Sequence, residues 1–151
     1  MGFRISLLTV RPGGSQTGPA EQFLQNYLRR CGPALAAELR TFRSAPALLQ
    51  GAAEARKRDA AVLWLADTSG LSISSEQFAA RIRQTRDGGH RHLLVAVGPA
   101  NGWTDADRAQ ADLRLSLGPM TLPHELAALV LAEQIYRAGT ILQGHPYHLG
   151  H

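Results

Sequence analysis

Short apolar runs alternate along this chain with segments in which apolar residues recur at helical spacing. The apolar runs predict strands at residues 3–10, 38–42, 60–66, 92–97 and 113–117. The helical spacing predicts helices at residues 19–30, 47–58, 74–87 and 126–138, and a short helix after Thr104. The runs 60–66 and 92–97 are apolar almost throughout, which is typical of parallel strands buried on both faces. The alternation predicts an α/β fold with a mostly parallel sheet and helices on both faces.

Capping residues set the predicted starts of three helices. Ser74 has Gln77 three residues on, the spacing of a capping box, and Thr104 is placed similarly before its short helix. Thr121 stands where the N-cap of the last helix is expected, with Pro123 in the first turn, where a missing N–H costs nothing. The chain shows no internal repeat, low-complexity tract or linker between these elements.

The size and composition indicate one globular domain. The chain has 151 residues, of which 44% are apolar and 19% charged, enough for a core and unlike a disordered protein. Cys31 is the single cysteine, which excludes an internal disulfide and suits a reducing compartment. The chain opens on a strand instead of a leader, and no apolar run reaches the roughly 18 residues that cross a bilayer. We expect one cytoplasmic domain, residues 1–151, with no membrane contact.

The net charge is +4 and is carried almost wholly by arginine. Arginine donates paired, planar hydrogen bonds that suit phosphate groups, so the charge favours a nucleic-acid partner. A solvated arginine face is the alternative, and composition alone leaves it open.

Three glycine-containing loops follow predicted strands, at residues 66–70, 98–102 and 117–122. In an open parallel sheet, ligands bind outside the carboxyl ends of the strands, and glycine lets the backbone approach a ligand closely. Plain strand-to-helix turns would need the same glycines. Spacing alone therefore leaves both a ligand pocket and simple turns open.

Several longer motifs resemble one known family. Residues 115–124 read LSLGPMTLPH, residues 133–138 read EQIYRA and residues 144–148 read GHPYH. Residues 66–79, ADTSGLSISSEQFA, and residues 97–102, VGPANG, are similar to two further loops of the same family. On these motifs the chain resembles the ribosomal RNA large subunit methyltransferase H family, small knotted enzymes of the SPOUT class.

The resemblance implies a SPOUT fold with a C-terminal trefoil knot, in which the last segment threads back through a loop. It implies the cofactor S-adenosylmethionine, held by the three glycine-containing loops. Carried over residue by residue, the cofactor contacts fall on Ala66, Gly98, Leu117, Gly118, Pro119, Met120, Thr121 and Leu122. It also implies a homodimer in which each chain completes the partner's pocket, and methyl transfer to N3 of a pseudouridine in 23S rRNA of the assembled ribosome.

Three residues near the C-terminus are the candidates for the chemistry that the resemblance implies. N3 of the base is mostly protonated at neutral pH, so transfer requires proton loss and alignment with the methyl group. We expect His148 to assist proton removal, Tyr147 to pack on or hydrogen-bond the base, and Arg137 to bind phosphate or base. The alternatives are helix packing at a dimer interface for Arg137 and Tyr136, and a structural hydrogen bond for His148.

Four positions depart from the family pattern. Leu71 and Leu149 replace basic residues, Ala128 replaces an arginine, and Pro99 replaces the second glycine of its loop. The lost charge keeps a second function open, that of a catalytically degenerate SPOUT homologue acting as a non-enzymatic ribosome- or RNA-associated dimer. A generic flavodoxin-like nucleotide binder is disfavoured by the C-terminal motifs.

The histidines at the end of the chain invite comparison with metal sites. His145, His148 and His151 lie close in sequence, but Pro146 opposes a helix that would present the first two on one face. No cysteine or carboxylate accompanies them. We predict no metal.

Overall fold

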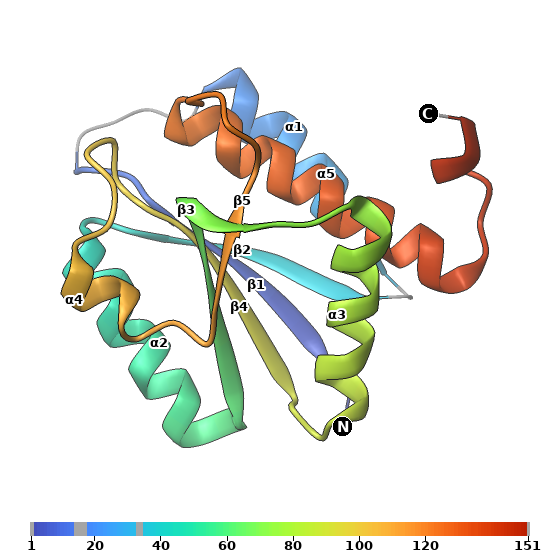
Figure 1. Ribbon diagram of the computed structural model, residues 1–151, viewed down its shortest axis with the longest axis horizontal. Helices are drawn as coiled ribbons and strands as arrows, with labels where there is room; N and C mark the ends of the chain where they lie inside the picture. The colour runs from blue at the N-terminus through green and yellow to red at the C-terminus, as the bar shows by residue number, and fades with distance from the viewer. Residues whose placement is uncertain (1, 14–17, 33–34, 151) are drawn as a thin grey trace.

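The computed structural model describes residues 2–13, 18–32 and 35–150. Five strands form one parallel sheet in the order β2-β1-β4-β3-β5 (Figure 1). The strands are β1 (Arg4–Val10), β2 (Ala36–Phe42), β3 (Ala61–Ser72), β4 (His92–Val97) and β5 (Leu113–Ser116). The helices are α1 (Pro19–Arg30), α2 (Ala45–Asp59), α3 (Ser75–Asp87), α4 (Asp105–Arg108) and α5 (His124–Gln143), followed by a 3₁₀ turn, η1 (His148–Gly150).

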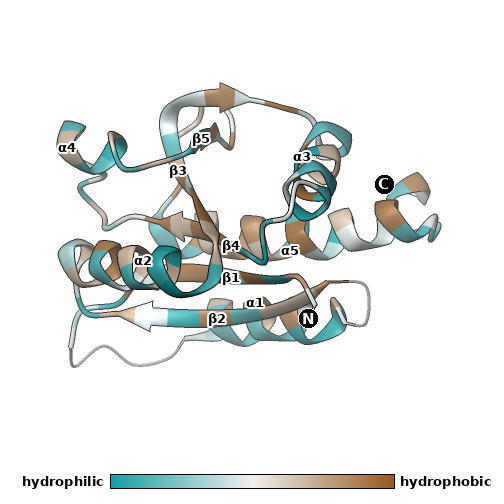
Figure 2. Cartoon of the chain, turned by 90° about the horizontal axis from the view of Figure 1, so that it is seen from below, coloured by the Kyte–Doolittle hydropathy of each residue, from teal (hydrophilic) through white to brown (hydrophobic). Residues whose placement is uncertain are grey.

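Helices cover both faces of the sheet, as predicted. Helices α1, α3 and α5 pack on one face and α2 packs on the other (Figures 1 and 2). Alternate residues of β1 divide accordingly, because successive side chains of a strand point to opposite faces. Ile5 and Leu7 join the core under α1 and α5, whereas Leu8 and Val10 join the core under α2. The parallel α/β prediction is confirmed, while the knot implied by the resemblance stays a prediction.

Local capping chemistry starts two helices where the sequence predicted. The Ser74 hydroxyl accepts from the Gln77 backbone N–H at 3.1 Å, and the Gln77 side chain accepts from the Ser74 N–H at 2.8 Å. Thr104 and Asp107 form the same reciprocal pair at 3.0 and 3.1 Å. Each pair satisfies two backbone donors that a helix start leaves without partners.

The start of α5 differs from the prediction. Thr121 is not the N-cap; the helix begins at His124, Pro123 occupies the N-cap position, and no side chain caps it there. The helix also runs to Gln143, beyond the predicted end at residue 138, and stops at Gly144, whose φ of 72° is the left-handed conformation that glycine adopts without strain. The helix is therefore long enough to reach from the carboxyl edge of the sheet to the C-terminal tail.

Two strands are longer than predicted. Strand β2 starts at Ala36, two residues before the predicted start. Strand β3 continues past Ala66 to Ser72, so the turn predicted at residues 67–70 is wrong as a strand end. Both Ala66 and Leu71 pair with Leu115, so the residues between them form an irregular bulge. Gly70 makes the bulge possible, because a Cβ there would lie 2.6 Å from the Arg114 carbonyl carbon.

Two further predictions concern the single cysteine and contact with a membrane. Cys31 is buried, and burial raises the pKa of its thiol to about 12, which suits its interpretation as an inert thiol. Among the described residues, no helix combines the length and apolarity needed to cross a bilayer.

A buried polar pair joins β1 and β4 near their amino ends. His92 is 1% exposed, and its Nε2 lies 2.7 Å from the Ser6 hydroxyl. Its Nδ1 lies 3.4 Å from the Arg4 guanidinium and 3.6 Å from the Asp59 carboxylate. Burial lowers the pKa of His92 to about 4, and repulsion from Arg4 adds to this against the opposing attraction of Asp59. His92 is therefore neutral in the folded protein near pH 7.

Because His92 is buried and neutral, we expect the folded protein to lose stability in acid. The unfolded chain binds a proton near pH 6.5, but the folded chain binds it only near pH 4, so unfolding takes up a proton between these values. The free energy of unfolding should fall by about 1.4 kcal/mol per pH unit below pH 6.5, or about 3 kcal/mol in total from this group. Urea unfolding of wild type and His92→Gln at pH 7 and pH 5 measures this change in the free energy of unfolding. If both proteins lose the same stability at pH 5, the acid sensitivity does not come from His92.

Candidate functional site

The bulge of β3 and the carboxyl ends of β4 and β5 meet around one cavity of about 280 Å³, which we call the strand-end cavity. The start of this bulge and the loops after β4 and β5 supply most of its lining, and the first turn of α5 closes it through His124 and Ala127. Parallel strands present their carboxyl ends at the same edge of a sheet, so three segments far apart in sequence come together here.

Six of the eight residues predicted to contact a cofactor line the strand-end cavity. They are Ala66, Gly98, Leu117, Gly118, Met120 and Leu122. Pro119 and Thr121 lie in the same loop and are exposed, but they are not among the described lining residues. The resemblance thus selected residues that border one cavity although they are separated by up to about fifty residues along the chain, and their contact with a cofactor stays a prediction.

Trp103, which the sequence analysis missed, holds two of these loops together. Its indole N–H donates to the Ala66 carbonyl at 2.9 Å, tying the loop after β4 to β3. Its ring packs on Gly98, where a Cβ would come within 2.8 Å of the ring atom Cε2. Gly98 is therefore required by the tryptophan as well as by the cavity. Pro99, which departs from the family pattern, also lines the cavity beside them.

An acidic group is fixed in the cavity wall by arginine. The Asp67 side chain is 4% exposed and accepts from Arg108 Nε at 2.7 Å and from Arg114 Nη1 at 3.3 Å. It also accepts from the Ser69 N–H and hydroxyl. Burial alone would raise the pKa of Asp67, but the hydrogen bonds from Arg108 and Ser69 outweigh it and leave the pKa below its usual value. The wall therefore carries an ionised carboxylate and the Arg108 guanidinium.

The loop after β5 is shaped by Ser116 and Gly118. The Ser116 hydroxyl accepts from the Gly118 N–H at 3.1 Å. Gly118 has a φ of 123°, which residues with a side chain rarely adopt, and a Cβ there would meet nothing within 4 Å. The constraint on Gly118 is thus its backbone conformation, whereas the constraint on Gly98 is space.

The three residues predicted to act on the substrate, Arg137, Tyr147 and His148, lie together with Glu133 in a second group. We call these four residues the tail cluster. Arg137 Nη1 lies 2.8 Å from His148 Nδ1, and Arg137 also contacts Glu133 through Nη2 at 2.7 Å and Nε at 3.3 Å. The Tyr147 hydroxyl donates to Glu133 at 2.7 Å. The hydrogen bond to Glu133 raises the pKa of Arg137, while burial and then the Glu133 bond raise the pKa of Tyr147.

Glu133 was missed as a functional residue, although it lies inside a quoted motif. Its spacing of four residues from Arg137 on a helix was the available signal. Aromatic contacts extend the cluster toward α1: Tyr136 lies edge-on to Tyr147 at 4.8 Å, and the Arg30 guanidinium lies over the Tyr136 ring at 4.5 Å.

The tail cluster and the strand-end cavity lie apart in one chain. Arg137 is ten residues beyond Ala127 on α5, which corresponds to about 15 Å along the helix axis. His148 instead approaches α3, where its Nε2 lies 3.3 Å from the Glu76 carboxylate. The structure therefore brings the three predicted residues together but does not place them in the cavity of the same chain.

The described part of the C-terminal tail does not bring metal-binding side chains together. Among the described residues, no three His, Cys, Asp or Glu side chains form a group that could hold a metal ion. His145 Nδ1 accepts from the Tyr147 N–H at 3.1 Å, so this histidine stabilises the tail turn. His151 lies outside the described residues.

Sequence comparison decides the family. A family model described as Predicted SPOUT methyltransferase matches residues 3–148. The chain belongs to the SPOUT methyltransferase family. It is 40% identical to Ribosomal RNA large subunit methyltransferase H of Brucella anthropi, over 96% of this chain and 98% of that protein. The same-named protein of Rhizobium meliloti matches with equal identity and coverage. The resemblance drawn from the motifs is confirmed.

Solved structures described as methylases or methyltransferases share the fold at low identity. A probable methylase family protein from Haemophilus influenzae superposes with a TM-score of 0.57 and 13% identity, covering 97% of this chain and 71% of that one. A probable methyltransferase from Bordetella pertussis superposes with a TM-score of 0.57 and 14% identity, covering 90% of this chain and 96% of that one. A putative methyltransferase from Legionella pneumophila, solved with bound SAM, superposes with a TM-score of 0.53 and 16% identity. The match covers 90% of this chain and 66% of that one. At these identities the likeness concerns the fold.

The contact of Gly98 with Trp103 predicts a steric effect. In Gly98→Ala the new methyl group would overlap the indole, and we expect a loss of about 1–3 kcal/mol in the free energy of unfolding. Gly32→Ala is the matched control, because a Cβ at Gly32 meets nothing within 4 Å, and its stability should change by less than about 0.5 kcal/mol. Urea unfolding measures both. Equal stability of the two variants would show that the indole moves aside freely.

Proposed function

We propose that this protein is an S-adenosylmethionine-dependent methyltransferase that acts on N3 of a pseudouridine in 23S rRNA of the assembled ribosome in the cytoplasm. The observation that carries the proposal is the convergence of the family's three loops on one cavity. The names of the relatives, which are ribosomal RNA large subunit methyltransferases, support an rRNA substrate. We also propose that residues 1–151 make one domain whose C-terminal segment is knotted.

The residues around the strand-end cavity fit S-adenosylmethionine. This cofactor supplies a methyl group bonded to a sulfonium sulfur. Gly98 and Gly118 let backbone groups approach it, and Leu117, Met120 and Leu122 offer apolar contact for its adenosine. The Asp67 and Arg108 side chains place charges of both signs at the wall, which suits a ligand that carries a carboxylate and cationic groups. Pro119 and Thr121 are assigned to the same loop as supporting positions.

We assign the tail cluster to the nucleobase and its proton. Arg137 is a donor only, so its 2.8 Å contact makes His148 Nδ1 the acceptor, and the proton of a neutral ring then resides on Nε2 toward Glu76. His148 accepts a proton from N3 once Arg137 turns to an RNA phosphate or to the base. Tyr147, held by Glu133, packs on or hydrogen-bonds the base. The bound cofactor would supply the methyl group, while Arg137 and Tyr147 would hold the base and His148 would take up the proton that N3 loses.

We further propose that the protein acts as a homodimer. A tail cluster about 15 Å from the cavity of its own chain can serve the cavity of a partner. Helices α1 and α5 expose apolar side chains that a second copy would bury: Phe23 is 61% exposed, Leu126 46% and Val130 38%. Leu126 and Val130 are one helical turn apart and so share a face of α5.

The alternative, a non-enzymatic dimer, has two observations in its favour. Leu71 and Leu149 replace basic residues of the family and are 46% and 86% exposed, so RNA-facing charge is absent at both positions. Under this alternative the protein binds S-adenosylmethionine or ribosomes without transferring a methyl group. A transfer assay separates the two functions.

The test uses labelled S-adenosylmethionine and assembled ribosomes from cells that lack this modification. Wild type should place the label on N3 of a pseudouridine, identified by mass spectrometry of nucleosides. His148→Ala should lower the transfer rate by about 100-fold or more with cofactor affinity unchanged, because general-base assistance is worth that much. His90→Ala, an exposed histidine near the amino edge of the sheet, is the control and should keep the wild-type rate.

Two results would count against the proposal. Absence of label with wild type, while an active ribosomal methyltransferase works in parallel, favours the non-enzymatic dimer. A full transfer rate in His148→Ala would show that His148 does not take part in the chemistry. Its role would then be the structural hydrogen bond with Arg137.

A further inference from the structure

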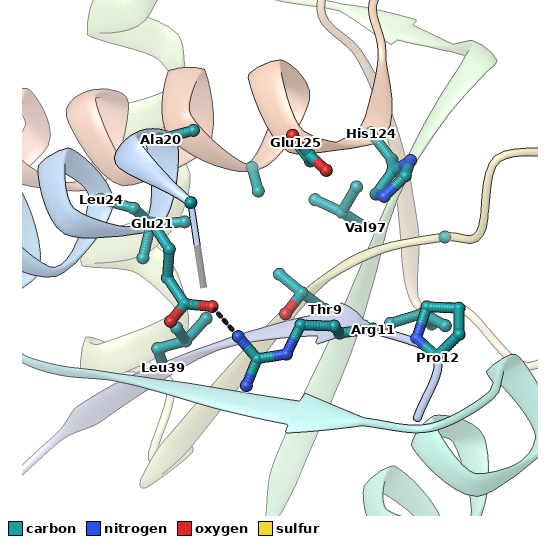
Figure 3. Close-up of a pocket in the computed structure, with 14 residues that line it drawn as sticks. Thr9, Arg11, Pro12, Ala20, Glu21, Leu24, Leu39, Val97, His124 and Glu125 are labelled. Carbon is teal, nitrogen blue, oxygen red and sulfur yellow. Dashed lines mark hydrogen bonds and ion pairs between the residues drawn. The ribbon is translucent and has the colours of Figure 1, made fainter. Parts of the chain in front are cut away.

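A second cavity lies between the carboxyl ends of β1 and β4, and we call it the switch-point cavity (Figure 3). Strand β1 connects through α1 to β2 on one side, whereas β4 connects through α4 to β5 on the other. Adjacent parallel strands whose connections diverge leave a crevice in which open α/β sheets bind ligands. Of the proposed cofactor contacts in the described part of the chain, Gly98 alone also lines this crevice.

The switch-point cavity is the immediate neighbour of the strand-end cavity. Val97, Gly98 and His124 line both of them. The two cavities therefore adjoin at these residues, and a ligand in one lies beside a ligand in the other. This is the relation that methyl transfer needs, because the acceptor atom must approach the methyl group from the side opposite to sulfur.

The lining of the switch-point cavity suits a flat, uncharged ring. Leu24, Leu39 and Ala128 give it apolar walls. At the end away from His124, the Arg11 guanidinium and the Glu21 carboxylate form an ion pair with Nη1 and Oε1 at 2.8 Å (Figure 3). The Arg11 backbone is itself fixed by its N–H, which donates to the Phe42 carbonyl at 2.7 Å. Since the pair is neutral overall, it favours a ring with a donor beside an acceptor over a free phosphate.

Arg11 also bears on one departure from the family motif. Ala128 stands where the family has an arginine, and Ala128 is buried in the wall of this cavity. Arg11 brings a guanidinium to the same cavity from the opposite wall, out of the end of β1. The positive group missing from α5 is thus present here in another position.

We propose that the switch-point cavity holds the acceptor pseudouridine base, and that the Arg11–Glu21 pair distinguishes it from uridine. The inference rests on the proposed function and adds the residues that recognise the substrate. With N3 directed at the residues that line both cavities, the ring edge beside N3, formed by N1 and C2, faces Arg11 and Glu21. Pseudouridine has an N1–H donor beside its C2 carbonyl on that edge: Glu21 accepts from N1–H, and Arg11 donates to the carbonyl.

Uridine in the same pose lacks one of these two contacts. Its ribose is attached through N1, so a C5–H group faces Glu21 where pseudouridine has N1–H, and the C4 carbonyl faces Arg11 where pseudouridine has the C2 carbonyl. The Arg11 contact is common to both bases and the Glu21 contact belongs to pseudouridine alone. Glu21 therefore sets specificity, whereas Arg11 sets binding of either base.

The test compares ribosomes that carry pseudouridine at the target position with ribosomes that carry uridine there, from cells without the isomerising enzyme. Wild type should methylate the pseudouridine ribosomes at least about tenfold more efficiently, measured as kcat/KM, because a hydrogen bond to a charged group is lost with uridine. Glu21→Gln should reduce this ratio toward one, since its amide then presents a donor to N1–H. Arg11→Met should lower kcat/KM for both ribosomes by a similar factor and keep the ratio.

Controls separate this inference from the proposed function. Affinity for S-adenosylmethionine, measured by calorimetry, should be unchanged in Glu21→Gln and Arg11→Met, and Glu54→Gln on α2 should match wild type throughout. If wild type discriminates and Glu21→Gln keeps the wild-type ratio, the base is read elsewhere and this inference alone is wrong. If wild type binds the cofactor but methylates neither ribosome, the proposed function fails and the inference fails with it.

Discussion

Helix α5 is the rigid element that decides how this site has to be assembled. Its first turn borders the strand-end cavity through His124 and Ala127, and its second half carries Glu133 and Arg137. An α-helix rises 1.5 Å per residue, so the two functional regions stay about 15 Å apart whatever the loops do. A methyl donor and a proton acceptor must both reach one nitrogen atom at about 3–3.5 Å. A single copy of the chain does not bring them together, whereas in the homodimer that we propose the tail of a second copy would reach the cavity.

The cavities at the carboxyl edge depend on close approach of the backbone. Trp103 fills the space beside Gly98 and holds the Ala66 carbonyl, so the start of the β3 bulge and the loop after β4 are fixed relative to each other before any ligand arrives. Asp67 is held in the ionised form by Arg108. A site fixed in this way loses little conformational freedom on binding, which favours affinity and accurate alignment of the reacting atoms.

The sequence predicted most elements because their signals are local. The capping boxes at Ser74 and Thr104 and the apolar run of β4 depend on residues within a few positions of one another. Two predictions failed where partners distant in sequence decide the outcome. Strand β3 continues beyond Ala66 because Gly70 approaches the backbone of Arg114. Helix α5 starts at His124 without the Thr121 cap, because the preceding loop follows the cavity wall instead.

The same distinction holds for the candidate site. Motif resemblance located six lining residues of the strand-end cavity and all three predicted members of the tail cluster. It missed Trp103, Arg108 and Glu133, whose roles depend on contacts that only the folded chain shows. The switch-point cavity was also missed, because Arg11 and Glu21 lie outside the motifs on which the resemblance rests.

The central claim is that each active site draws on two chains, and mixed dimers test it most directly. One variant, Gly98→Val, blocks the strand-end cavity, and the other, His148→Ala, disables the tail cluster. Each should be nearly inactive alone. After unfolding and refolding together, half of the dimers are mixed and each has one intact site, so about a quarter of the wild-type methyl transfer to ribosomes should return. Activity no higher than the sum of the separate variants, with mixed dimers verified by mass, would contradict the account.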